Sequence, residues 1–221
     1  MTWLTYNWGW ALELLWAHLL LAVPAIVASV LISVPLGRLA HRRPRAGGTV
    51  LGFASLLYAI PALPLLIVIP ALTGTSIRSS ATMIIALTIY GVALLVRSAA
   101  DAFSSVDTTV SDAAVAIGHS PRSVFWRVEL PLAVPVIVAG TRVVTVSTVG
   151  LVTIGALVGV PNLGTLLTDG FQRGITAEVV TGVVLTVVLA LVLDALLLAV
   201  GRALTPWRRT PARVKPTAVT A

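Results

Sequence analysis

The chain has no cysteine, a single lysine and few charged residues of any kind. Charged side chains make up 10% of its 221 residues, whereas about a quarter is usual for a soluble domain. The absence of cysteine excludes disulfides and cysteine-based metal sites. The one lysine, Lys215, lies near the C-terminus and no GxxxxGK[ST] phosphate loop occurs, so the sequence predicts that this chain does not cradle ATP.

Other catalytic and metal-binding patterns are missing as well. The sequence contains no HExxH, no paired histidine spacing and no Gly-x-Ser-x-Gly, so we predict no enzyme active site, no metal and no cofactor bound by this chain. The net charge of +7 raises the alternative of a nucleic-acid binder. The charges flank apolar runs, however, which is typical of membrane topology signals, and we therefore expect no nucleic-acid partner.

Apolar residues dominate what remains. They form 57% of the chain, and they gather into five runs that are long enough to cross a lipid bilayer as helices. The runs cover residues 12–39, 50–72, 81–100, 132–158 and 177–204. We predict an all-α, multi-pass protein of the plasma (inner) membrane with five transmembrane helices. Its predicted parts are an interfacial segment (1–11), a transmembrane domain (12–204) and a disordered basic cytoplasmic tail (205–221).

The second apolar run contains Pro61, Pro64 and Pro70. Proline removes a backbone donor and bends a helix, and a membrane tolerates this where neighbours or water satisfy the freed carbonyls. The run therefore predicts a broken helix beside a cavity, with simple kinking as the alternative.

The basic residues predict the orientation in the membrane. If the segment between the third and fourth runs is cytoplasmic, nearly all arginines and the lysine lie inside, and only Arg78 and Arg173 lie outside. Lysine and arginine are enriched in cytoplasmic loops. We therefore predict that the N-terminus is outside and the C-terminus is in the cytoplasm.

That same segment, residues 105–131, is the longest polar interruption of the chain. Asp107 is placed to cap a first short helix, and Ser120 followed by Pro121 is placed to begin a second,. Gly118 lies where a left-handed turn would end the first helix. Pro131 disfavours the α conformation at Leu130 and predicts a break or bend there. Glu129 is expected to be solvated.

The spacing of this segment resembles the EAA loop of ATP-binding-cassette (ABC) importer permeases. Asp112-Ala113-Ala114 is followed by three residues and Gly118, and nine further residues lead to Val128-Glu129-Leu130-Pro131. The family pattern has Glu in place of Asp112 and Ile in place of Val128. The alternative is an ordinary amphipathic loop between two membrane helices.

Further stretches resemble permeases of osmoprotectant importers, which carry glycine betaine, carnitine or choline. They are Leu15-Trp16-x-His18-Leu19, Ile60-Pro61-Ala62-Leu63, the run from Val128 to Arg142, and Ile154 to Gly164. Val160-Pro161-Asn162 departs from the family's glycine-rich run. Permeases of methionine and other amino-acid importers share the loop, so that substrate class stays open. The resemblance implies the type I (MetI-like) permease fold, with the coupling loop between the third and fourth spans.

The resemblance also implies partners and a mechanism. Two permeases, identical or paralogous, would form the pathway within membrane lipids. A cytoplasmic ABC ATPase dimer would hold ATP and Mg²⁺, and an extracytoplasmic binding protein would deliver the substrate. The residues implied to couple to the ATPase are Asp112, Ala113, Ala114, Gly118, Leu130 and Pro131. A scaffold or channel-like subunit without an ATPase is the alternative from another functional class.

Five residues are candidates for the translocation pathway: Tyr58, Pro61, Tyr90, Arg142 and Asp194. Aromatic faces attract quaternary amines through cation–π interactions, although both tyrosines also suit a packed core. Arg142 and Asp194 each lie about 15 Å from the cytoplasmic ends of their predicted helices, at about 1.5 Å per residue. We predict that they pair or line one wet cavity, the alternative being that Arg142 extends to the interface.

Overall fold

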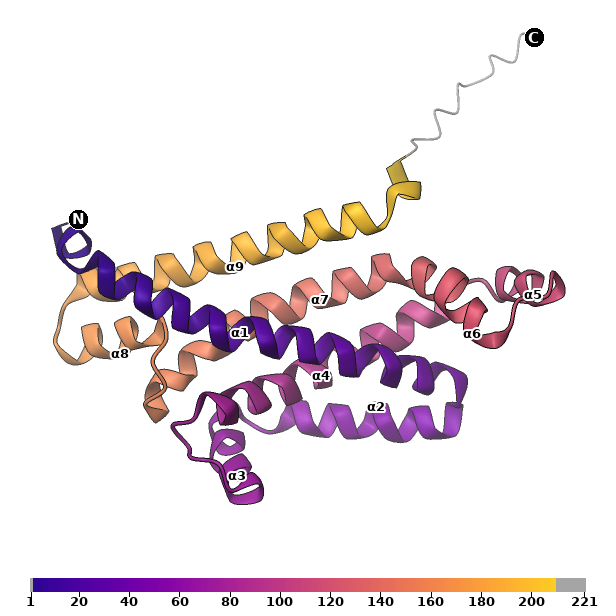
Figure 1. Cartoon of the computed structure of the whole chain (residues 1–221). Coiled ribbons are helices and arrows are strands. Elements are labelled where there is room, and N and C mark those ends of the chain that lie inside the picture. The colour runs from indigo at the N-terminus through magenta and orange to yellow at the C-terminus, as the bar shows by residue number, and fades with distance from the viewer. Residues whose placement is uncertain (1, 210–221) are drawn as a thin grey trace, which may run out of the picture.

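Four long helices set the architecture of the computed structural model, which describes residues 2–209. They are α1 (Thr2–Arg42), α4 (Ser80–Ser104), α7 (Leu130–Val152) and α9 (Thr176–Leu204), and they run along one common axis (Figure 1). Each belongs to a stretch that is long and apolar enough to cross a membrane. The shorter helices are α2 (Pro44–Ala59), α3 (Ala62–Thr73), α5 (Thr108–Ala116), α6 (Pro121–Val124) and α8 (Gly164–Gln172).

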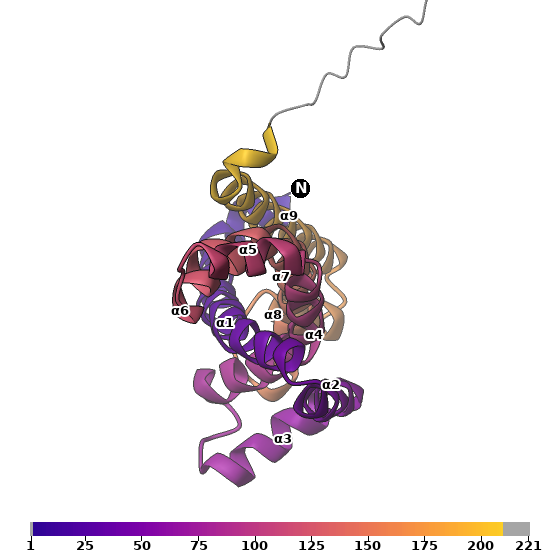
Figure 2. The ribbon, with the colours of Figure 1, turned by 90° about the vertical axis from the view of Figure 1, so that its right-hand side faces the viewer.

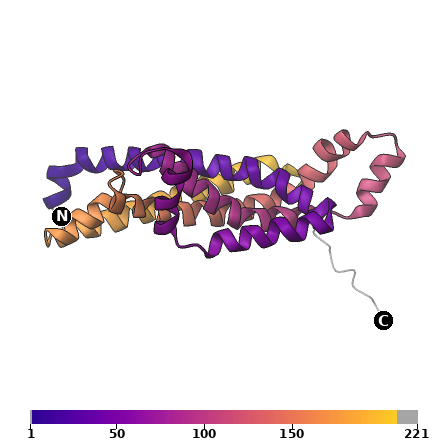
Figure 3. The same ribbon diagram turned by 90° about the horizontal axis from the view of Figure 1, so that it is seen from below.

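The two ends of the bundle carry different elements. The helices α5 and α6 project from one end, and α8 lies near the N-terminus at the other end (Figures 1 and 3). The C-terminal end of α9 points toward the same side as α5 and α6 (Figure 1). The N-terminus and residues 105–131 therefore lie at opposite ends of the bundle, which is the relative arrangement that the sequence predicts.

The long helices pack against one another in chain order. The helix α1 lies along α4, α4 contacts α7, and α7 contacts α9; seen from the α5–α6 end, α1, α4 and α7 surround the axis (Figure 2). Small residues allow the closest approach. A Cβ atom added to Gly37 of α1 would lie 2.7 Å from the backbone nitrogen of Ala100 in α4, so only glycine fits at this crossing.

The outer surface of the bundle is apolar. Large hydrophobic side chains are exposed along α9, including Val184, Val188, Leu191 and Leu196. Water would disfavour such a continuous apolar face, whereas lipid does not. The surface of the molecule thus agrees with the hydropathy of the sequence.

The proline-rich second run is a bent pair of helices. The helix α2 ends at Ala59, α3 begins at Ala62, and the two axes meet at 109°. Pro61 is extended (φ −61°, ψ 146°) and precedes the first residue of α3. The predicted break is therefore present. Residues 2–209 contain four helical stretches that are long and apolar enough to cross a membrane, or five if the bent pair is counted as one.

Two boundaries differ from the prediction. The helix α1 begins at Thr2, so residues 2–11 are helical and continuous with the first apolar run, with a kink at Asn7 (φ −118°); the interfacial position of this segment stays a prediction. The stretch between the fourth and fifth predicted runs contains α8. Asn162 Oδ1 accepts the N–H of Gly164, the first residue of α8, at 2.6 Å, and Leu166 is buried. The 3₁₀ turn Pro206–Arg209 opens the tail, and residues 210–221 of the predicted disordered tail lie outside the described range.

Candidate functional site: the helical loop between α4 and α7

The loop begins with a side-chain cap on α5. The Asp107 carboxylate accepts the backbone N–H of Thr109 at 2.9 Å, as the sequence predicts. Hydrogen bonds from the side chain and backbone of Thr109 hold the pKa of Asp107 below its usual range. The cap fixes where α5 begins, only a few residues after α4 ends at Ser104.

Gly118 ends α5 in a left-handed turn, with φ +94°. The N–H of Gly118 donates to Val115, and the N–H of His119 donates to Ala114 at 3.1 Å. Ser120 then caps α6 by accepting the N–H of Ser123. The predicted turn is present, and it folds α5 and α6 into the hairpin-like projection of Figure 1.

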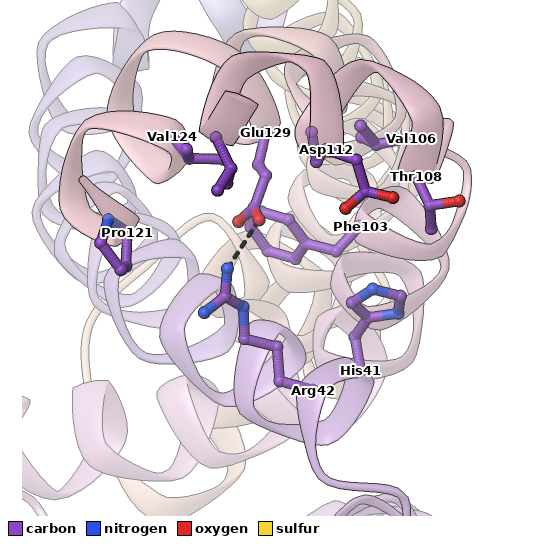
Figure 4. Close-up of a pocket in the computed structure, with 11 residues that line it drawn as sticks. His41, Arg42, Phe103, Val106, Thr108, Asp112, Pro121, Val124 and Glu129 are labelled. Atoms are coloured by element: carbon purple, nitrogen blue, oxygen red, sulfur yellow. Dashed lines mark hydrogen bonds and ion pairs between the residues drawn. The ribbon is translucent and has the colours of Figure 1, made fainter. Parts of the chain in front are cut away.

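The three residues Asp112, Ala113 and Ala114 face different ways. Ala114 is buried, whereas Asp112 and Ala113 are exposed. Asp112 lines a cavity of about 330 Å³ between the loop and the ends of α1 and α4. Figure 4 shows Asp112 on one wall and Arg42 with His41 on the other. Val115 lines the same cavity and is partly exposed in it, whereas Ile117, directly after α5, is 78% exposed.

The predicted break at Pro131 is wrong. Leu130 is α-helical (φ −64°, ψ −48°), and its N–H donates to the carbonyl of Phe125, five residues back. A π turn, Phe125–Glu129, runs directly into α7. The extra residue of the π turn shifts the hydrogen-bond register at Leu130, which lets the continuous helix accommodate Pro131, a residue that has no N–H to donate,. Leu130 and Pro131 therefore join the loop to α7 as one continuous helix.

Glu129 is not solvated as predicted. Its side chain is 15% exposed and bridges two arginines at the end of α1. Oε2 accepts from Arg38 Nε and Nη2 at 3.2 and 3.1 Å. Oε1 accepts from Arg42 Nη2 at 2.7 Å, the contact that is drawn in Figure 4. The Arg38 guanidinium also lies 3.9 Å from the centre of the Phe125 ring. The spacing of Arg38 and Arg42, four residues apart on a helix, was the only sequence signal for this cluster.

Arg142 and Asp194 form a bidentate ion pair between α7 and α9. Arg142 Nε donates to Asp194 Oδ1 at 2.7 Å, and Nη2 donates to Oδ2 at 2.6 Å. Their side chains are 35% and 24% exposed. The predicted pairing is present. It fixes two helices at a depth where either charge alone is costly.

The other pathway candidates meet at the break between α2 and α3. The rings of Tyr58 and Tyr90 lie edge to face, with centroids 6.2 Å apart. The hydroxyl of Tyr90 donates to the carbonyl of Ile60, directly before Pro61. Tyr90 is buried and Tyr58 is about half exposed. Tyr90 thus satisfies a carbonyl at the break, which is a packing role, while Tyr58 remains about half exposed.

No group of three His, Cys, Asp or Glu side chains suited to a metal occurs within residues 2–209. The loop is a capped hairpin that is continuous with α7 and bridged to the end of α1 by ion pairs.

Comparison with known proteins identifies this arrangement. The family model "Binding-protein-dependent transport system inner membrane component" matches residues 29–210. The chain belongs to this family. It is therefore a membrane component of an ABC transport system.

Individual relatives and solved structures agree. The chain is 33% identical over 209 residues to the osmoprotectant import permease protein OsmW of Salmonella typhimurium, covering 90% of this chain and 94% of the relative. It is 29% identical over 209 residues to the glycine betaine/carnitine/choline transport system permease protein OpuCD of Bacillus subtilis, covering 94% and 90%. Its fold resembles an inward-facing MetNI methionine ABC transporter chain, with a TM-score of 0.77, 24% identity and coverage of 88% and 95%.

Proposed function

We propose that this chain is a permease subunit of an osmoprotectant importer. With a second permease, identical or paralogous, it forms the pathway for glycine betaine, choline, carnitine or a similar quaternary amine. Family membership and the names of its relatives support this class of substrate.

The observation that carries the proposal is the loop 105–131. A hairpin capped by Asp107 and Ser120 and turned at Gly118 projects from one end of the bundle and continues without a break into α7. Such an element suits docking into a groove of a cytoplasmic ATPase. We assign the contact to Asp112, Ala113, Ala114 and Gly118, and the transmission into α7 to Leu130 and Pro131.

The remaining parts of the proposal concern topology and partners. The bent pair α2–α3 counts as the second of five spans, the N-terminus is outside, and the loop and C-terminus are cytoplasmic. ATP and Mg²⁺ are held by the ATPase dimer, and an extracytoplasmic binding protein delivers the substrate. Of the two candidate tyrosines, we assign a transient contact with a quaternary amine to Tyr58, because it is about half exposed whereas Tyr90 is buried.

A second candidate is a permease for methionine or another amino acid, favoured by the likeness of the fold to the MetNI chain. Membership of a transport family weighs against the alternative of a scaffold without an ATPase.

Substrate-stimulated ATP hydrolysis separates these candidates. The chain is reconstituted in lipid with candidate ATPase and binding-protein partners, and glycine betaine, choline, carnitine, proline and methionine are compared. Stimulation by a quaternary amine is the expected result. Stimulation by methionine alone would keep the mechanism and overturn the substrate, and a failure to associate with any ATPase would overturn both.

A further inference from the structure

We infer that Glu129, Arg38 and Arg42 form a clamp that makes the end of α1 move with the loop 105–131 during transport. These three residues are called the α1 clamp below. The inference rests on the proposed function, because it concerns how motion of the docked loop reaches the membrane helices. Glu129 is a positioning residue in this view, since it touches neither substrate nor ATPase.

Chain connectivity leaves the end of α1 dependent on noncovalent contacts, which include the packing of Gly37 on Ala99 and Ala100 of α4 and the ion pairs of the α1 clamp. The loop is covalently continuous with α4, which ends at Ser104, and with α7, which begins at Leu130. The helix α1 is separated from Glu129 by about ninety residues of chain, since Arg38 and Arg42 lie 91 and 87 positions away. A push on the loop therefore reaches α4 and α7 through the backbone, but it reaches the end of α1 only through noncovalent contacts.

The geometry of the α1 clamp suits that task. Both oxygens of one carboxylate are used, and they hold two arginines that lie one helical turn apart. The carboxylate is 15% exposed, so water screens it less than a typical surface ion pair,. Phe125, on the same π turn as Glu129, stacks under Arg38 and contacts the Phe103 ring of α4 at 6.1 Å between centroids. Three elements thus meet at one point.

Removal of the Glu129 carboxylate breaks both ion pairs and also leaves two positive charges close together. Without Glu129, the two guanidinium groups four residues apart on α1 repel one another. Glu129→Gln therefore turns an attraction between α1 and the π turn into a weak polar contact, and it leaves the docking residues of α5 unchanged. The variant separates transmission of motion from docking.

Distance measurements test whether α1 and the loop move as one body. The chain contains no cysteine, so Leu39→Cys and Arg122→Cys place two spin labels cleanly, on exposed positions of α1 and α6. With Glu129 present, we expect the same narrow distance distribution in the nucleotide-free and ATP-bound complexes. With Glu129→Gln, we expect the distribution to broaden or to differ between the two states.

Coupled transport gives the second readout. We expect Glu129→Gln to bind the ATPase normally but to lower substrate uptake per ATP hydrolysed by about three- to tenfold, in the range seen for residues that carry coupling between sites. Arg38→Gln with Arg42→Gln is expected to give the same loss, and the triple variant no further loss, because all three act through one contact. Glu129→Asp, which keeps the charge, is expected to fall between wild type and Glu129→Gln.

Arg43→Gln is the matched control. Like Arg42→Gln, it removes one positive charge, and it does so at the next position of the chain. Arg43 is exposed and is not part of the ion pairs found within residues 2–209. We expect wild-type coupling from this variant.

Wild-type distances and wild-type coupling in Glu129→Gln would overturn the α1 clamp alone. A loss of coupling in Arg43→Gln as large as that in Glu129→Gln would overturn it as well. A wild-type chain that binds no ATPase would instead overturn the proposed function. Should Glu129→Gln fail to insert, Arg42→Gln, which keeps the Arg38 contact, supplies the same comparison.

Discussion

At the scale of single residues, Gly118 holds the conformation on which the loop depends. Its φ of +94° lies in the left-handed region, where a side chain costs about 1–2 kcal/mol,. The turn directs α6 back toward the bundle, so strain here displaces the surface that we assign to docking.

Gly118→Ala is therefore expected to reduce ATPase-coupled uptake while the protein still inserts in the membrane. Gly74→Ala is its matched control, because Gly74 also has a positive φ (+70°) and, like Gly118, has no atom within 4 Å of an added Cβ. Both variants carry a similar conformational cost, but only one lies in the loop. Uptake assays in vesicles with equal amounts of inserted protein make the comparison, and equal losses in the two variants would contradict a docking role.

The Arg142–Asp194 pair gives a second prediction at this scale. Removing one partner leaves the other charge alone within the membrane, whereas removing both leaves no unpaired charge. We expect Arg142→Met or Asp194→Leu alone to lower the yield of folded protein, and the double variant to restore much of it. Size-exclusion chromatography after mild detergent extraction measures the yield. A double variant that is as poor as the worse single variant would argue against the pair as a unit.

The role of a residue could be predicted from the sequence where its partners are close in the chain, and could not where its partners are distant in the chain. Asp107, Gly118 and Ser120 act through hydrogen bonds to neighbours within a few positions, and each has the predicted role in the turn. Glu129 was predicted to be solvated, because nothing in its local sequence shows that the end of α1 lies beside it. Arg142 and Asp194 were paired correctly only because two charges at matching depth in a membrane restrict the choice of partners.

At the scale of elements, the cap on α5 makes the loop sensitive to acid. Because the pKa of Asp107 is lower in the folded protein, its contribution to stability is present above about pH 4, the usual carboxyl range, and is lost as the pH falls through the lowered value,. Asparagine caps helices about as well as aspartate and does not titrate.

We therefore expect the amide protons of Thr109 and Val110 to lose protection from exchange at acidic pH in the wild type. The Asp107→Asn variant is expected to keep this protection, after correction for the intrinsic pH dependence of exchange. Hydrogen–deuterium exchange read by mass spectrometry measures both. An identical acid response in the two proteins would show that the cap does not control α5.

Elements were predictable where one strong signal decides them. Proline explains the break between α2 and α3, and apolar runs give the long helices to within a few residues, apart from the earlier start of α1. The helix α8 was missed because its stretch is short and glycine-containing, and Leu166 finds its apolar partners only in the folded core. The π turn before α7 was missed because a proline usually signals an interruption, and a change of helical register leaves no mark in the sequence.

At the scale of the whole molecule, the proposed orientation predicts which end faces the cytoplasm. Single cysteines at Phe171 and Arg122 lie near opposite ends of the bundle, and both positions are exposed. A membrane-impermeant maleimide added to right-side-out vesicles is expected to label position 171 directly and position 122 only after permeabilisation. The reverse pattern would place the loop outside and separate it from any cytoplasmic ATPase.

Site-specific photo-crosslinking of the assembled transporter tests most directly whether the loop 105–131 contacts the ATPase. A photoreactive residue at Ile117, 78% exposed directly after α5, is compared with one at Phe171, 81% exposed in α8 at the opposite end. We expect a covalent adduct with the ATPase subunit from position 117 and none from position 171, as identified by mass spectrometry. An ATPase adduct from position 171, or none from position 117 in a complex that hydrolyses ATP, would contradict the assignment of the loop as the coupling element.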